Sequence, residues 1–474
     1  MVRRKIRALP RWFVEQFGTS RHGSRIAYCY CRIAVALKPN SVEAQALLTE
    51  VLIKLGRFDD ALIIWEKAFL LNPEWCIHAQ IQYAFFQYGQ TQAGLTVLQR
   101  FVDVKNDFAR EHQLDKLGIR FLREFPTNIG HIALLDSYVK MGILKRRSKN
   151  HPVLLTHPLL ANPCYLKYWR RYLPDVITDA TACELLYPLA EYLEDHTFAV
   201  MDASNKQICG NYTSERSIQA QWEAEGRDPL LALTASDRER GENCLRTLGV
   251  PSDAWFVSLH VREGLTRIAD GRDANIDTYQ MAIESIVSRG GWVIRMGNPT
   301  MKPLSPMPHV IDYAHCDFRS DWMDVFLWAR CSFFIGTQSG PSHVPPTFGI
   351  PCVLTNWATI SVRWWFSQDI CIFKLHWSEH EARYLDFAEI ISSALGWAES
   401  TDYLASQRIK LVDNTPKEIN DVVLEMLDRL QGEPKYSKED EELQKRFNQL
   451  YISNINTANF GIGRDFLRKW EHLL

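Results

Sequence analysis

The sequence lacks the features that mark several common classes of protein. It has no apolar run of about 18 residues or more, so no segment is expected to cross a membrane as a helix. Residues 1–13 are basic and then aromatic, without the apolar core of a signal peptide. The 54 basic and 56 acidic residues nearly cancel, which leaves no excess of positive charge for binding nucleic acid.

Metal-binding and disulfide patterns are also missing. The 11 cysteines are scattered, and several lie within apolar runs, as do Cys331, Cys352 and Cys371. No CxxC pair, zinc-like Cys/His spacing or Asp-x-Asp motif occurs, so we expect no metal site. Buried free cysteine is typical of a reducing compartment, which predicts a cytoplasmic protein. Weak contact between the basic N-terminus and an anionic membrane surface is an alternative.

The first part of the chain is repetitive and helical. Ala27, Ala34 and Pro39 recur 34 residues later as Ala61, Ala68 and Pro73. This period is typical of tetratricopeptide units, in which small alanines let paired helices approach each other. We expect residues 1–112 to form a tetratricopeptide-like helical region of two or three units. So few units are marginal alone, and we expect them to pack on the next domain.

Strands alternate with helices after this region, which predicts an α/β fold with parallel sheets. We expect one α/β lobe in residues 113–235, a second in residues 236–405, and a C-terminal helical extension in residues 406–474. In the first lobe, residues 128–131 follow a strand and begin a helix. Gly130 there permits close backbone approach, and His131 is a candidate general base, with a structural role as the alternative.

The second lobe places polar residues where its predicted strands end. His260 and Arg262 follow one strand, Arg295 and Gly297 follow the next, and Asp312 follows a short extended segment. Because the carboxyl ends of parallel strands meet at one edge of a sheet, a ligand site is expected there. Asp312 is a candidate catalytic group that orients the donor or a basic residue.

Residues 331–355 contain the most informative stretch. An apolar strand is followed by the small residues Thr337, Ser339 and Gly340, and a short helix is expected over residues 342–348, which include His343, before a second strand. Such a loop is suited to an anion, typically a phosphate. Arg262 and Arg295 facing it would form a cradle for a diphosphate, since guanidinium matches phosphate oxygens through parallel N–H donors. The alternative is that each arginine pairs with a carboxylate; for Arg262 we expect no structural partner.

These motifs resemble known families. The His260-Val-Arg262 run resembles the His-x-Arg signature of fucosyltransferases, and residues 336–343 with 348–351 are similar to the sugar-nucleotide loop of heptosyltransferases. Residues 128–131 resemble the acceptor-side glycine loop of the N-terminal GT-B half. The whole order resembles a bacterial family of tetratricopeptide-containing GT-B glycosyltransferases. Glu263 and Gln338 depart from the residues usual in the two motifs.

The resemblance implies two Rossmann-like lobes in a GT-B arrangement after the helical region. It implies a metal-independent, inverting glycosyltransferase that needs no cofactor and uses a nucleotide-diphosphate sugar, with a GDP-linked sugar as one candidate. The nucleotide sugar would contact His260, Arg262, Arg295, Gly297, Thr337, Ser339, Gly340 and His343. His131 and Asp312 would serve catalysis. The helical repeats would present a protein or glycan acceptor, in the cytoplasm or at the inner membrane surface.

Two other classes of function stay open. One is a scaffold or binding protein on a degenerate GT-B fold, which would recruit partners through its repeats without transfer. The other is a nucleotide-sugar isomerase on the same two-lobed fold, which would convert the donor without an acceptor. The donor sugar is not specified by the sequence.

Overall fold

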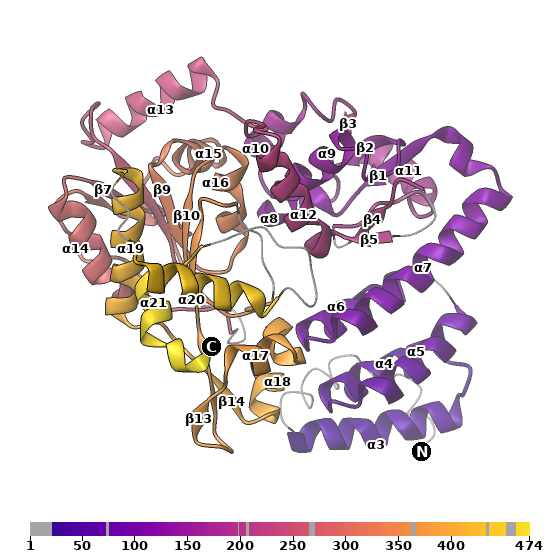
Figure 1. The fold of residues 1–474 in the computed structure, drawn as a ribbon. Coiled ribbons are helices and arrows are strands. Elements are labelled where there is room, and N and C mark those ends of the chain that lie inside the picture. The colour runs from indigo at the N-terminus through magenta and orange to yellow at the C-terminus, as the bar shows by residue number, and fades with distance from the viewer. Residues whose placement is uncertain are drawn as a thin grey trace.

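The computed structural model describes residues 21–72, 75–197, 199–204, 208–264, 271–361, 366–432, 436–451 and 461–474. The basic N-terminal stretch and Pro73 therefore lie outside the described residues. The described chain forms a helical segment followed by two α/β lobes (Figure 1). The predicted fold class, two Rossmann-like α/β lobes after an all-α segment, is confirmed.

The helical segment, residues 21–111, packs consecutive helices against one another. Ala27, Ala61 and Ala68 are fully buried, as their spacing predicts, because only a methyl group fits where the helices approach. Trp65 fills the core beside them. The helices are α3 (Arg21–Leu37), α4 (Val42–Lys54), α5 (Phe58–Leu71), α6 (Trp75–Gln87) and α7 (Thr91–Glu111).

The helical segment is docked on both lobes. Gly89 has a φ of 70°, and a Cβ there would lie 1.9 Å from the carbonyl oxygen of Ala394 in the C-terminal lobe. Only glycine is compatible with that approach. On the N-terminal lobe, Phe108 stacks on Tyr192 with ring centroids 4.0 Å apart. The expectation that this helical segment packs on the next domain is confirmed.

The N-terminal lobe is built on a parallel sheet with the strand order β1-β2-β3, here called the small sheet. The predicted helix after β1 is divided at Leu134 into α8 and α9. A short hairpin and α12 complete the lobe. The elements are β1 (Ile119–Leu122), α8 (Ile129–Ala133), α9 (Leu135–Ile143), β2 (His151–Leu155), α10 (Pro163–Trp169), β3 (Val176–Ile177), α11 (Ala180–Ala190), β4 (Ala199–Met201), β5 (Ile208–Gly210) and α12 (Asn211–Ala224).

The C-terminal lobe contains a seven-stranded parallel sheet with the order β15-β11-β10-β9-β6-β7-β8, here called the large sheet. Its central strands are continuous apolar runs because helices cover both faces. The elements up to its last central strand are α13 (Ala235–Thr247), β6 (Phe256–His260), η3 (Ile276–Tyr279), α14 (Gln280–Ser288), β7 (Trp292–Arg295), β8 (Val310–Ile311), η4 (Tyr313–His315), α15 (Asp321–Arg330), β9 (Phe333–Gly336), η5 (Gly340–His343), α16 (Val344–Thr347) and β10 (Cys352–Trp357).

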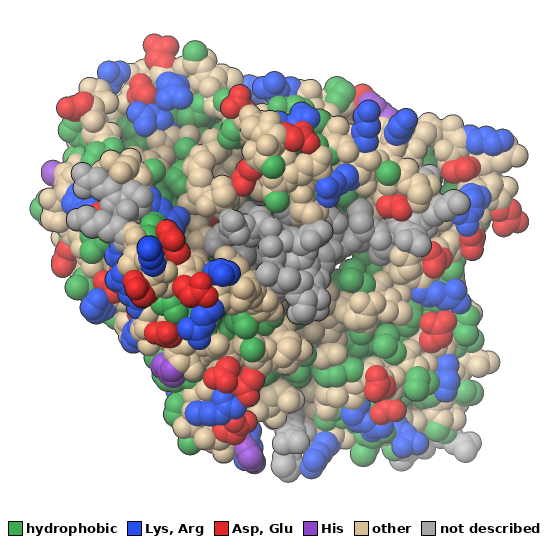
Figure 2. Space-filling view, viewed as in Figure 1, with side chains coloured by type: hydrophobic (Ala, Val, Ile, Leu, Met, Phe, Trp, Pro, Cys, Tyr) green, Lys and Arg blue, Asp and Glu red, His purple; other side chains and the backbone are tan. Residues whose placement is uncertain are grey.

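The end of the chain returns to this lobe. Residues 406–474 are mostly helical, as predicted, but they also supply β14 and β15, and β15 pairs with β11 in the large sheet. The remaining elements are β11 (Ile370–Phe373), β12 (Leu375–Ser378), β13 (Arg383–Tyr384), α17 (Phe387–Ile391), η6 (Ala394–Trp397), α18 (Thr401–Ser406), β14 (Ile409–Val412), α19 (Pro416–Leu430), α20 (Lys438–Gln449), β15 (Gly461–Ile462) and α21 (Arg464–Lys469). Acidic and basic side chains alternate over α20 and α21 (Figure 2).

One hydrophobic core runs through the helical segment and both lobes. Between the lobes, the Tyr165 hydroxyl of α10 lies 2.9 Å from Thr347 Oγ1 of α16. Asn162 donates a hydrogen bond to the carbonyl oxygen of Asp321 on α15. These contacts hold the carboxyl edge of the large sheet against the N-terminal lobe. Within the part of the chain that the structure describes, we find no helix with the length and apolarity of a membrane span.

Candidate active site

The ends of the neighbouring strands β6 and β9 form the centre of the candidate site. The Arg262 N–H donates to Thr337 Oγ1 at 3.0 Å, and the Thr337 N–H donates to the carbonyl oxygen of His260 at 3.3 Å. Ser339 Oγ lies 3.3 Å from Nδ1 of His260. The structure therefore brings together four of the residues that the sequence predicts for nucleotide binding. Because Thr337 is fully buried, its hydroxyl fixes the backbone on which Arg262 stands.

Arg262 has a carboxylate partner in this structure. Its Nε lies 3.1 Å from Oδ1 of Asp273, and both side chains are mostly buried, with 13% and 19% of their surface exposed. The expectation that Arg262 has no structural partner is therefore wrong. Asp273 was missed because it lies 11 residues further along the chain, in a loop whose charges give no hint of their pairing.

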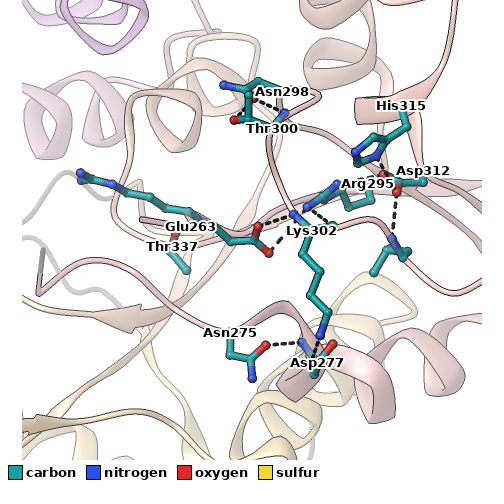
Figure 3. Close-up of polar contacts among 12 residues, drawn as sticks. Glu263, Asn275, Asp277, Arg295, Asn298, Thr300, Lys302, Asp312, His315 and Thr337 are labelled. Carbon is teal, nitrogen blue, oxygen red and sulfur yellow. Dashed lines mark hydrogen bonds and ion pairs between the residues drawn. The ribbon is translucent and has the colours of Figure 1, made fainter. Parts of the chain in front are cut away.

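Arg295 lies beneath the site and does not open onto it. Its side chain is fully buried, with Nη1 3.0 Å from Oδ1 of Asp312 and Nη2 2.9 Å from the carbonyl oxygen of Lys302. Glu263 lies 3.7 Å from Nη2 and accepts a hydrogen bond from the Lys302 N–H at 2.7 Å (Figure 3). This is the structural network that the sequence left as the alternative for Arg295, and it braces the loop that follows β7.

Asp312 orients a basic residue, one of the two roles considered for it. Its carboxylate also accepts hydrogen bonds from the Leu304 N–H at 2.9 Å and from Nδ1 of His315 at 2.9 Å (Figure 3). It follows β8, the strand at the edge of the large sheet, whereas His131 packs beside the end of β9. The structure therefore does not bring the two candidate catalytic residues together.

Gly297 is a packing position. A Cβ there would lie 2.4 Å from Sδ of Met301, so the glycine makes room for the loop that Arg295 braces. It follows β7, so it lies one strand from His260, at the end of β6, and two strands from residues 337–340, which follow β9.

The two lobes meet at a contact between Gly130 and Gly340. A Cβ on Gly130 would lie 3.0 Å from Cα of Gly340, and one on Gly340 would lie 2.7 Å from Cγ2 of Ile129. Asn128 caps α8 by accepting a hydrogen bond from the Gly130 N–H at 2.9 Å, which holds the loop in this position. The predicted acceptor-side loop and the predicted sugar-nucleotide loop are thus in van der Waals contact.

This contact places His131 beside His343. Nδ1 of His131 lies 3.4 Å from the carbonyl oxygen of Glu124, which favours the tautomer with the proton on Nδ1 and the lone pair on Nε2. Burial lowers the pKa of His131, and the nearby Glu124 opposes that shift. Burial, with the nearby His131, lowers the pKa of His343 to about 3. Both rings are therefore neutral near neutral pH, which suits His131 to accept a proton.

His260 is neutral for the same reason. Its side chain is buried, and that burial, with the positive charges of Arg295 and Arg262, lowers its pKa to about 4. A neutral imidazole can donate one hydrogen bond and accept another, but it supplies no charge to an anion. Of the two predicted nucleotide-binding arginines, Arg295 is fully buried, so Arg262 is the one whose charge is partly exposed at the carboxyl edge of the sheet.

Gln338 connects the site to the helical segment. It donates hydrogen bonds to Thr359 Oγ1 and to Glu399 Oε1, both at 2.9 Å, and accepts the N–H groups of Ala358 and Thr359. The Glu399 N–H in turn donates to the carbonyl oxygen of Gln87 at the end of α6. The amide at position 338 is thus a structural connector.

Glu124 is a second residue that sequence reasoning missed. It follows β1 and accepts hydrogen bonds from the Thr197 N–H and hydroxyl at 3.1 and 3.0 Å, while His196 Nδ1 lies 3.5 Å from it. Burial would raise the pKa of Glu124, but His196 and these hydrogen bonds outweigh it and lower that pKa to about 2. Its place at the carboxyl end of a predicted strand was the available signal. Among the described residues, no three His, Cys, Asp or Glu side chains are grouped to hold a metal ion.

Comparisons with known proteins give remote structural likenesses. No protein-family model and no curated protein matches the chain. Among solved structures, the chain is similar to a glycosyl transferase family 9 protein from Veillonella parvula, at 9% identity and a TM-score of 0.36, over 54% of this chain and 86% of that one. The iron-containing dodecameric glycosyltransferase TibC from enterotoxigenic E. coli matches at 15% identity and a TM-score of 0.37, over 66% and 77%. A Thermobaculum terrenum O-GlcNAc transferase matches over 98% and 97%, at 14% identity and a TM-score of 0.22.

The neutral state of His260 predicts a loss of stability in acid. Its pKa is about 4 in the folded chain against an ordinary value of 6.5, so the unfolded chain binds more protons between these values. The contribution of His260 to the free energy of unfolding should be fully present above pH 6.5 and should be lost as the pH falls towards 4. Between about pH 7 and about pH 5 this one group accounts for on the order of 2 kcal/mol. Urea denaturation of the parent and of His260→Gln at about pH 7 and about pH 5 measures this difference in unfolding free energy. The variant should lose less unfolding free energy between the two pH values than the parent. An equal loss would contradict a neutral His260.

Proposed function

We propose that the chain is a glycosyltransferase that moves a sugar from a nucleotide-diphosphate sugar to a protein or glycan acceptor. One observation carries the proposal, the contact between Gly130 and Gly340. It brings neutral His131 of the N-terminal lobe close to the strand ends of the C-terminal lobe, which carry Arg262 and Thr337. A proton acceptor and an anion site on facing lobes are what sugar transfer from a diphosphate requires.

Arg262 is the proposed contact to the diphosphate. Its guanidinium can offer parallel N–H donors to phosphate oxygens, and it stands at the carboxyl edge of a parallel sheet, where ligands bind. Asp273 would orient the guanidinium from the side of the loop. The hydroxyls of Thr337 and Ser339 and the backbone of Gly340 would line the same site, with neutral His260 and His343 as hydrogen-bonding groups. Arg295 would act from beneath, by holding Glu263 and the loop after β7.

His131 is the proposed base. Its Nε2 would take the proton of the acceptor hydroxyl as that oxygen attacks the anomeric carbon, and the bond to the diphosphate would break on the opposite face. The configuration at the anomeric carbon is inverted in such a step. The leaving diphosphate takes the electron pair of the broken bond, and Arg262 with the neighbouring N–H groups offsets its charge without a metal ion.

The proposal includes two candidate donors and a place where the acceptor would bind. The motif at positions 260–262 is similar to that of fucosyltransferases and the loop at 336–343 to that of heptosyltransferases, so a GDP-linked and an ADP-linked sugar are both candidates. We propose that the tetratricopeptide-like helices present the acceptor, since they dock beside Glu399 and thereby close to the candidate site. We propose a cytoplasmic place of action, with weak contact to the inner membrane as an alternative.

The nucleotide site is tested by a pair of substitutions at Arg262 and its partner. A thermal-shift panel of GDP-, UDP-, ADP- and CMP-sugars first identifies the preferred nucleotide, because a bound ligand raises the melting temperature. Arg262→Ala should then weaken nucleotide binding by about ten- to a hundredfold in calorimetric titration, since charge-assisted hydrogen bonds contribute about 1.5–3 kcal/mol each. Arg262→Ala and a control variant, Asp273→Asn, should each lose on the order of 1 kcal/mol of unfolding free energy, because both break the ion pair.

Asp273→Asn is the matched control. It removes the ion pair but keeps the guanidinium, so its nucleotide affinity should stay within a fewfold of the parent's. Parent-like affinity in a folded Arg262→Ala protein would remove the diphosphate role and most of the case for a transferase.

The base is tested by His131→Gln. Transfer should slow by about a hundred- to ten-thousandfold, the range that general base catalysis supplies, while donor affinity stays unchanged. Release of nucleoside diphosphate in the presence of a glycan and peptide panel measures the rate, and His472→Gln, at an exposed position, is the control. Parent-like transfer by His131→Gln would exclude it as the base. Donor conversion without an acceptor would instead favour the isomerase, and partner binding without any turnover the scaffold.

The metal-independent mechanism is tested by chelation. EDTA should leave transfer activity intact, because protein cations and N–H groups are proposed to offset the charge of the leaving group. Loss of activity on chelation, restored by added manganese or magnesium alone, would move the protein to a different mechanistic class.

A further inference from the structure

A pocket lies on the N-terminal lobe at the end of α9 and the beginning of β2. Its volume is about 440 Å³, enough for a small phosphorylated compound. It lies at the opposite end of the α8–α9 run from His131, and these helices span residues 129–143, so about 20 Å separates the two sites. Its lining includes Val139, Lys145, Arg147, Ser148, Lys149 and Tyr172.

The pocket carries the positive charge of three basic residues, Lys145, Arg147 and Lys149. Among the described residues, no carboxylate forms an ion pair with Lys145, Arg147 or Lys149. Of the nearby acids, Asp175 pairs with His151, and Asp202 accepts hydrogen bonds from the Ser204 hydroxyl. Three like charges gathered in a concave surface attract an anion, and protein surfaces more commonly intersperse the two signs.

Residues 145–149, which carry the three basic side chains, are held in place by hydrogen bonds to backbone carbonyl groups. Nε of Arg147 donates to the carbonyl oxygen of Tyr138 at 3.0 Å, and Nη1 donates to that of Ser148 at 3.1 Å. The guanidinium also lies over the Tyr138 ring, 4.1 Å from its centroid. Lys145 adopts a φ of 57°, which ends α9 and turns the chain into the pocket wall. The site is therefore formed before any ligand arrives.

Ser148 supplies an independent sign of a ligand. Only 3% of the residue is exposed, it lines the pocket, and within the described part of the chain its Oγ has no hydrogen-bond partner. A buried hydroxyl without a partner is costly, and an oxygen of a bound anion would satisfy it. Val139 and Tyr172 add an apolar and an aromatic wall that would contact the carbon part of a phosphate ester.

We propose that this pocket binds a phosphate group, with Lys145 and Lys149 supplying charge and Ser148 a hydrogen bond. This goes beyond the proposed function and does not depend on it. The phosphate has two sources that share this chemistry, a free phosphate or sugar phosphate and the headgroup of an anionic lipid, and the two arms of the experiment distinguish them.

The first arm titrates inorganic phosphate and glucose 1-phosphate into the full chain at fixed ionic strength and follows the melting temperature. The parent should be stabilised, and the apparent affinity should fall about tenfold or more in Lys145→Gln/Lys149→Gln and severalfold in Ser148→Ala, which changes no charge. Lys116→Gln/Arg146→Gln removes the same charge from exposed positions outside the pocket and should keep parent-like affinity. Arg262→Ala should also retain the response, which separates this pocket from the candidate donor site.

The second arm measures cosedimentation with phosphatidylcholine vesicles, with and without phosphatidylglycerol. Binding that needs phosphatidylglycerol and is lost in the pocket variants assigns the phosphate to a lipid, whereas a response to the soluble probes assigns it to a free compound. The proposal is overturned if the pocket variants match the parent in both arms, or if the control pair loses as much binding as Lys145→Gln/Lys149→Gln.

Discussion

The close approach of Gly130 and Gly340 is the constraint on which the candidate site depends. Two backbones can come so near only where both residues lack a side chain. The contact fixes the distance between a helix start of one lobe and a strand end of the other. His131, His343, Ser339 and the strand ends behind them take their relative positions from it. A methyl group at either glycine would have to push against backbone or against the partly buried Ile129, so the lobes would separate or the loops would move.

The two arginines at the carboxyl ends of the strands of the large sheet are subject to a second constraint, the cost of removing a charge from water. A guanidinium near a sheet edge is partly removed from water, and the protein provides a carboxylate for each one: Asp273 for Arg262, and Asp312 with Glu263 for Arg295. The two arginines differ in depth. Arg295 is fully enclosed and braces a loop, whereas Arg262 keeps some exposure beside the Thr337 hydroxyl. The same residue type at neighbouring strand ends therefore serves two different purposes.

Much of this arrangement follows from local patterns in the sequence. The apolar runs ending at His260, Arg295 and Gly336 are strands, and because all three are parallel, their ends meet. The alanine period of the first repeats gives the buried helix contacts. Local patterns say nothing of partners far along the chain, which is why the Arg262 ion pair was missed. The two-residue strand β15 is also too short to be recognised by periodicity, although it extends the large sheet from the far end of the chain.

The position of Glu399 has a consequence for folding. The Glu399 N–H donates to the carbonyl oxygen of Gln87 at the end of α6, and its carboxylate accepts a hydrogen bond from Gln338. Gly89, two residues after Gln87, packs against Ala394. The helices and the C-terminal lobe thus share their supports, and their apolar interiors are continuous. Separating the helices from the lobe would expose buried apolar surface and at the same time weaken the support of the Gln338–Glu399 hydrogen bond. The repeats are therefore part of one cooperative unit with the lobe and do not behave as an appended module that could be cut off or exchanged.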